Sequence, residues 1–165
     1  MMAFPLSISA RIAESVYGML REDIALAAHF RTLKRAEIEE VFRDRYTTPA
    51  LGVIIEATSE ERRGTTTILE TYLMLGMITE PVSSGISGPE VWQRDCVVAH
   101  IRQVLNRWPG GAIRDFEDQD RWIAQGLTRF ERVPLTGQIQ GGTQIITPIR
   151  VIFTTDLSQA TREIL

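Results

Sequence analysis

The sequence predicts an α+β fold in which an antiparallel or mixed sheet of about four strands packs against two or three helices. Two observations lead to this prediction. The segments follow the order helix, short helix, hairpin, helix, hairpin, so helices and strands are grouped rather than alternating. The chain has 165 residues, of which 44% are hydrophobic, which suits one core. We expect a single domain over residues 1–165, with residues 1–9 as an N-terminal extension and residues 156–165 as a C-terminal tail.

The first part of the chain is predicted to be helical. Ser9 is a good N-cap, and the apolar residues after it recur at helical spacing in a pattern that can continue to Phe30. These apolar residues are Ile12, Val16, Met19, Leu20, Ile24 and Leu26. A short second helix is expected over residues 35–44. It ends before Pro49, because the residue that precedes a proline avoids the helical conformation.

A β-hairpin is expected next. The residues of segment 51–58 alternate with a period of two, which is typical of a strand. Residues 59–64 are expected to be a charged turn, and residues 65–78 to be a second, longer strand rich in threonine, isoleucine and leucine. The pair predicts a hairpin whose tip faces solvent or a partner protein.

The clearest helix covers residues 90–108 and follows a loop of proline, serine and glycine at residues 81–89. Its apolar residues cluster on one side at 3.6-residue spacing: Val97, Val98, Ile101, Val104, Leu105 and Trp108. Pro109-Gly110-Gly111 ends it. The remaining segments are, in order, a polar, acidic connection (112–125), a third strand (127–135), a glycine-rich turn (136–142) and a fourth, central strand (143–155).

The composition excludes several classes of protein. The net charge is −3, so the chain lacks the excess of positive charge that a dedicated nucleic-acid binder needs. The single cysteine, Cys96, excludes an intrachain disulfide and a cysteine-rich zinc site. The apolar runs are far too short for a membrane span, and the start has no signal-peptide pattern. We therefore expect a soluble protein of a reducing compartment, with no membrane partner.

The only pair that suggests nucleophilic catalysis is Cys96 and His100, four residues apart on the clearest helix. The helical pattern places both away from the core face, on a surface or subunit-facing strip with Gln103 and Arg107. No oxyanion site or orienting third group can be assigned. We therefore predict no catalytic residue.

Two acidic clusters were considered as metal sites. Their members are Glu37, Glu39, Glu40 and Asp44 on the short helix, and Asp115, Glu117, Asp118 and Asp120 in the connection. The second cluster does not match an EF-hand loop, and it lacks the histidines and glycines that usually accompany a metal site. The glycine pairs match no phosphate-binding motif. A solvated loop is the better interpretation, and we predict no metal and no cofactor.

The expected hairpin tip carries arginines that suggest an interface. Arg62 and Arg63 stand beside Glu60 and Glu61, which cancel the positive field that a nucleic-acid surface would need. A protein partner or plain solvent is the better interpretation.

Five features in residues 10–154 together resemble a known family. They are an amphipathic helix that ends near Leu20, a proline-led strand (49–56), a charged turn (60–64) with a threonine-rich return strand, a helix (91–108) and two closing strands (127–135 and 143–155). In this order they resemble the tail terminator proteins of long-tailed bacteriophages, also called tail completion or minor tail proteins.

The resemblance implies a structural virion protein, assembled in the host cytoplasm, that forms a homo-oligomeric ring, typically a hexamer. Such a ring caps the head-proximal end of the tail tube, stops polymerisation of the tube protein and joins the tail to the head connector or stopper protein. DNA passes through its lumen without specific binding. Our hypothesis places interface residues at the hairpin tip and the glycine-rich turn: Glu60, Glu61, Arg62, Arg63, Gly137, Gln138 and Gln140.

Three alternatives stay open. The nearest is another phage neck component, such as a head completion or stopper protein. A small α+β enzyme that uses Cys96 and His100 would lose its activity on mutation of Cys96 to serine, whereas a ring protein would still assemble. A non-viral dimeric domain would hold a ligand in a pocket between helix and sheet.

Overall fold

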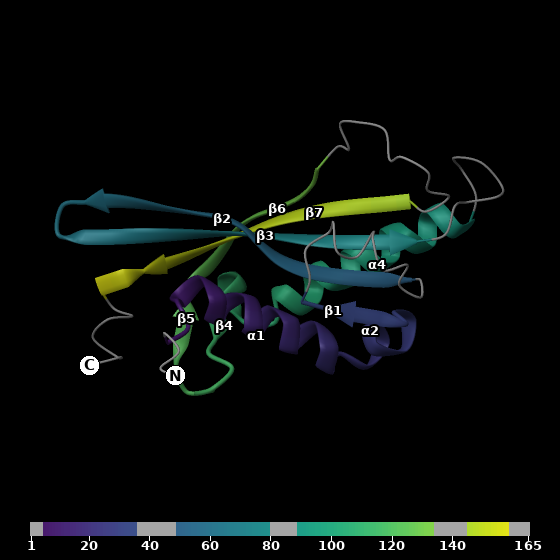
Figure 1. Cartoon of the computed structure of the whole chain (residues 1–165), viewed down its shortest axis with the longest axis horizontal. Coiled ribbons are helices and arrows are strands. Elements are labelled where there is room, and N and C mark those ends of the chain that lie inside the picture. Colours follow the sequence, from purple (N-terminus) through teal and green to yellow (C-terminus); the bar gives the residue numbers. More distant parts are fainter. Residues whose placement is uncertain (1–4, 36–48, 80–88, 134–144, 159–165) are drawn as a thin grey trace.

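The chain combines helices with a large sheet (Figure 1). The structure, a computed structural model, describes residues 5–35, 49–79, 89–133 and 145–158. These residues form three α-helices, one five-stranded mixed sheet and one two-stranded sheet. The predicted α+β class is therefore confirmed, whereas the large sheet has five strands rather than about four.

The predicted first hairpin forms the middle of the large sheet, whose strand order is β1-β2-β3-β7-β6. It consists of β2 (Ala50–Arg63) and β3 (Thr66–Thr79), which pair antiparallel along their whole length. The parallel strand β1 (Thr32–Lys34) lies beside the first residues of β2. The sequence pattern did not predict β1, because three residues are too few to show a period.

The two closing strands pair antiparallel, as predicted. They are β6 (Gly126–Arg132) at the sheet edge and β7 (Ile145–Asp156), which lies between β6 and β3. The interior position of β7 agrees with its apolar residues on both faces. Its core-facing side chains Ile149, Val151 and Phe153 are fully buried.

The helices cover one face of this sheet. They are α1 (Ile8–Glu22), α2 (Ile24–His29) and α4 (Pro89–Leu105). The predicted apolar stripes face the core, as the exposed fractions show: Ile12, Val16, Leu20, Ile101 and Leu105 at 0%, and Val98 at 6%. They pack with Leu73, Leu75 and Met77 of β3. Helix α4 ends three residues earlier than predicted, so Trp108 follows it and is only half-buried.

The N-terminal helix begins earlier and ends earlier than the sequence predicts. Ser7, not Ser9, is the N-cap, and its hydroxyl accepts a hydrogen bond from the Ala10 amide at 3.1 Å. Ser9 lies inside the helix, where its buried hydroxyl bonds that of Thr71 at 2.9 Å. Asp23 interrupts the helical pattern with an extended backbone, so the expected continuous helix to Phe30 is two helices.

The charged segment predicted as a turn is part of β2. The strand continues through Arg63, and only Gly64 and Thr65 make the turn. Gly64 has a φ of 65°, a left-handed conformation that glycine adopts without steric cost. The hairpin is therefore longer, and its tip narrower, than expected.

The polar connection contains more structure than predicted. A short 3-10 turn at Pro109–Gly111 follows α4, and β4 (Ile113–Arg114) and β5 (Trp122–Ala124) pair antiparallel. Gly111 has a φ of 73°, and a Cβ there would meet the Leu127 Cβ at 2.3 Å. The glycine thus allows the turn to pack closely against β6.

Several predicted segments lie wholly or mostly outside the described residues. They are the short helix (35–44), the loop (81–89), the glycine-rich turn (136–142) and most of the C-terminal tail (156–165). Among the described helices, none is long and apolar enough to cross a membrane.

Candidate interaction surface

The outer half of the β2–β3 hairpin projects beyond the helices (Figure 1). Every residue of β2 from Ile55 to Arg63 is exposed, whereas Ala50–Val53 of the same strand are buried. In the described part of the chain, β1 covers the outer edge of β2 only at Ala50–Gly52. Backbone groups farther along this edge have no described strand beside them, which is the arrangement that permits pairing with another chain.

A β-bulge at Glu56 separates the two halves of β2. Ile55 pairs with Leu73 and Ala57 pairs with Tyr72, so Glu56 is the extra residue. One extra residue exchanges the faces of all side chains that follow. As a result Glu60 and Arg62 lie on the helix side of the sheet, and Glu61 and Arg63 lie on the opposite side.

An ion-pair network joins three strands beside this bulge. Arg150 of β7 donates from Nε and Nη2 to the two carboxylate oxygens of Glu56, at 3.0 and 2.8 Å. Glu131 of β6 lies 3.5 Å from Nη1 of the same arginine. The hydrogen bonds from Arg150 lower the pKa of Glu56 below its ordinary value, and they raise the pKa of Arg150. The network thus links β2 to β7 and β6 at the point where the projecting half begins.

The four predicted charged residues of the tip are all exposed, but only two of them pair with each other. Arg63 Nη2 donates to Glu61 Oε2 at 3.0 Å. Glu60 and Arg62 have no ion-pair partner among the described residues. Their face of the tip therefore carries an unpaired carboxylate and an unpaired guanidinium. The other three predicted interface residues, Gly137, Gln138 and Gln140, lie outside the described residues.

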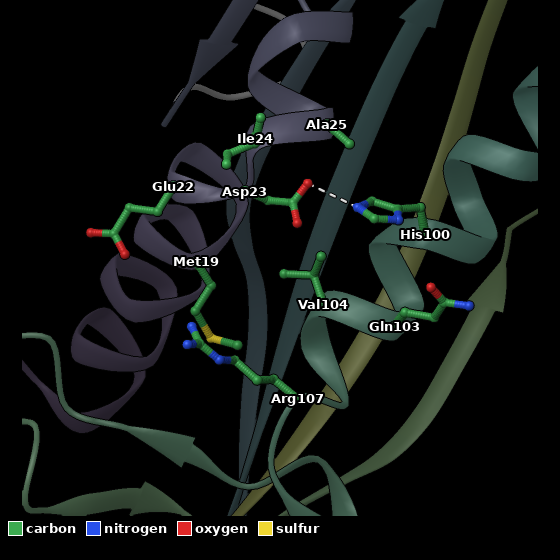
Figure 2. A pocket seen from close by; sticks show the side chains of 9 residues that line it. All are labelled: Met19, Glu22, Asp23, Ile24, Ala25, His100, Gln103, Val104 and Arg107. Atoms are coloured by element: carbon green, nitrogen blue, oxygen red, sulfur yellow. Dashed lines mark hydrogen bonds and ion pairs between the residues drawn. The ribbon is translucent and has the colours of Figure 1, made fainter.

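A second surface feature is a cleft of about 690 Å³ (Figure 2). One wall is the junction of α1 and α2, and the other is the outer side of α4. The lining residues are Met19, Glu22, Asp23, Ile24, Ala25, His100, Gln103, Val104 and Arg107. The sequence pattern did not reveal this cleft, because the break at Asp23 that shapes one wall was not predicted.

Asp23 connects the two walls of the cleft. Its Oδ1 lies 2.8 Å from His100 Nε2 and accepts a hydrogen bond from the Leu26 amide at 3.0 Å. Burial alone would raise the pKa of Asp23, but the hydrogen bonds from Leu26 and His100 outweigh it and lower the pKa below its ordinary value. Asp23 is thus the N-cap of α2 and the partner of α4.

Cys96 and His100, the pair that suggests nucleophilic catalysis, form no hydrogen bond with each other in the described structure. His100 bonds to Asp23, whereas Cys96 is exposed and has no hydrogen-bond partner in the part of the chain that the structure describes. Gln103 of α4 is exposed, as predicted, and so is Arg107, which follows the end of the helix at Leu105. His100 therefore joins α4 to the α1–α2 junction through Asp23.

The prediction of a solvated acidic loop is wrong for Asp115, which is fully buried. Arg11 of α1 donates to Asp115 from Nε at 3.0 Å and also pairs with Glu117 at 3.1 Å. This ion pair fixes α1 to the segment between β4 and β5, across 104 residues of sequence. In residues 5–35, 49–79, 89–133 and 145–158, no group of three or more His, Cys, Asp or Glu side chains suits a metal ion.

Comparison with known proteins gives one kind of match only. No known protein family matches the sequence, and no curated protein is detectably similar to it. Among solved structures, one similar chain belongs to a structure titled "Virion of native gene transfer agent (GTA) particle". It is 12% identical in sequence, and the alignment covers 92% of this chain and 98% of that chain with a TM-score of 0.47.

Proposed function

We propose that this chain is a structural virion protein that forms a ring at the head-proximal end of a phage tail tube. The ring stops polymerisation of the tube protein and joins the tail to the head connector, and DNA passes through its lumen without specific binding. The observation that carries the proposal is the projecting outer half of the β2–β3 hairpin. The exposed, polar β2 strand of this half, residues 55–63, suits contact with a neighbouring subunit better than catalysis.

The edges of the sheet support a ring. A ring contact between identical subunits is heterologous, which means that it joins two different surfaces of the chain and must close on itself. The sheet has β6 at one edge and the outer half of β2 at the other. These edges differ in length and in side chains, so they are suitable as the two unlike partners of such a contact.

The first test is native mass spectrometry of the purified protein, with negative-stain images of the same sample. The proposal predicts a closed ring whose mass is six times that of the 18.6 kDa chain. If the purified protein is monomeric, the same measurement is made after addition of preformed tail tubes. A chain that neither forms rings nor binds tube ends would contradict the proposal. A ring that binds the connector but not the tube would indicate a stopper instead.

Charge reversal at the tip tests the contact surface. R62E/R63E should weaken ring formation or tube binding at least tenfold, because like charges would replace the expected complementary ones. The matched control is R31E/R102E, which changes the net charge equally at exposed arginines away from the tip. Both variants should retain the wild-type circular dichroism spectrum. Equal assembly by the two variants would contradict a role for the tip.

A further inference from the structure

The hairpin tip and the cleft between α4 and the α1–α2 junction lie toward opposite ends of the molecule (Figure 1). The tip is the far end of the projecting half, whereas α2 and α4, whose residues line the cleft, lie beside the other half of the sheet. One chain cannot bring these two surfaces together. Any contact between them joins two copies, and because the surfaces differ, the contact is heterologous.

The cleft has unpaired charges of both signs on its two walls. Glu22 stands on the α1 wall, and Arg107, two residues after the end of α4, stands on the opposite wall (Figure 2). Within the described residues neither has an ion-pair partner, although Arg107 stacks on Trp108 at 5.3 Å. The remaining charged groups, Asp23 and His100, satisfy each other at 2.8 Å. The charge that the cleft offers to a partner is therefore one carboxylate and one guanidinium.

The rim of the cleft also carries an exposed apolar side chain. Ile24 is 87% exposed, the highest value among the large hydrophobic residues described. Met19 and Val104 continue the apolar surface between the charged groups. A partner that docks in the cleft would remove this apolar surface from water, which favours binding.

We propose that the hairpin tip of one copy docks in this cleft of the next copy. Arg62 then faces Glu22, and Glu60 faces Arg107, so that the unpaired charges of both surfaces are satisfied. The two tip residues suit this role because they are two positions apart on one face of β2, about 7 Å along the strand. This inference rests on the proposed ring and names the surface that receives the hairpin.

Disulfide trapping between two single-cysteine proteins tests the docking directly. Both proteins carry C96S, and one adds T65C at the turn while the other adds Q103C in the cleft. The tip charges stay intact in both. After mixing and mild oxidation, the heterodimeric disulfide should form at least tenfold faster than in a control mixture of T65C with Q119C, an exposed loop position. Equal rates in the two mixtures would overturn the proposal.

Charge exchange tests the assigned pairs in the same assay. R62E on the tip protein, or E22R on the cleft protein, should slow the trapping about tenfold. Mixing R62E with E22R should restore at least a third of the original rate, because the pair is re-formed with its signs exchanged. A mixture of the two that is as slow as either one alone would overturn the assigned pairing.

The products distinguish failure of this inference from failure of the proposed function. Closed rings without trapping would retain the ring and overturn the docking. Trapped open chains that bind no tail tube would support the docking and contradict the ring. If T65C forms a disulfide with a cysteine of the tube protein but not with Q103C, the tip contacts the tube and the docking is overturned.

Discussion

The two halves of β2 belong to one hydrogen-bonded ladder, yet they differ in what supports them. The inner half, Ala50–Val53, is buried under the helices, whereas the outer half, from Ile55 onward, is exposed. An isolated two-stranded hairpin is only marginally stable in water. The outer half is supported instead by β7, which pairs with β3 as far as Ile68, and by the Glu56–Arg150 ion pair. The outer half of β2 is thus held in place by its neighbouring strands although its own side chains are exposed.

The largest difference between the halves should appear on removal of apolar side chains. Leu75 of β3 is fully buried, and L75A should reduce the free energy of unfolding by about 4 kcal/mol because it leaves a cavity. Ile55, which is 42% exposed, is the matched position in the outer half, and I55A should cost less than about 1 kcal/mol. Urea denaturation of both variants measures these free energies of unfolding. Equal losses in L75A and I55A would contradict the difference between the buried and the exposed half.

The buried ion pair between Arg11 and Asp115 should contribute more to stability than the exposed pair between Arg63 and Glu61 at the hairpin tip. D115A leaves Arg11 partly buried with the exposed Glu117 as its other ion-pair partner, so we expect a loss of about 3 kcal/mol in the free energy of unfolding. E61A removes the exposed partner of Arg63 at the tip and should cause no measurable loss, because solvent screens such pairs. Thermal unfolding compares them. A wild-type melting temperature for D115A would show that the buried pair does not hold α1.

Two glycines with left-handed backbones allow a finer comparison. G111A adds a Cβ that would clash with Leu127 and should destabilise the fold by about 2 to 3 kcal/mol. G64A at the tip has the same backbone strain but no atom within 4 Å, so it should cost only about 1 kcal/mol. The difference between the two values measures the close packing of the turn after α4. If G64A is the more destabilising variant, the packing argument fails.

The smallest expected effect is a pH dependence at the base of the projecting half. Arg150 lowers the pKa of Glu56 below about 4.5, the ordinary pKa of glutamate. The pair therefore stabilises the fold fully at pH values above 4.5. That stabilisation is lost as the pH falls through the lowered pKa of the folded state. An NMR titration of the Glu56 carboxyl should show its pKa rise in R150Q and stay unchanged in R129Q. An unchanged pKa in R150Q would contradict the assignment.

Local patterns predicted much of the fold and little of the candidate surfaces. Ile12, Val16 and Leu20 recur at helical spacing, so they lie on one side of α1, and this side faces the core. The return strand was predicted to within one residue for the same kind of reason. The tip residues were singled out correctly as exposed, but their strand conformation was missed. Charged residues rarely favour a strand, and here the pairing with β3 overrides that preference.

Local sequence patterns were sufficient to predict most of the longer helix and strand segments, the two antiparallel hairpins and the side of α4 that enters the core. These features depend on residues close together in the sequence, and the spacing of apolar side chains indicates them. The three-dimensional packing was needed to show that Ser9 bonds Thr71, that Arg11 pairs with the buried Asp115, and that Glu56 pairs with Arg150. Each of these pairs lies more than sixty residues apart, so it exists only once packing has brought two faces together. The cleft and the projecting half also have this origin, since both are shapes made by elements that are distant in the sequence.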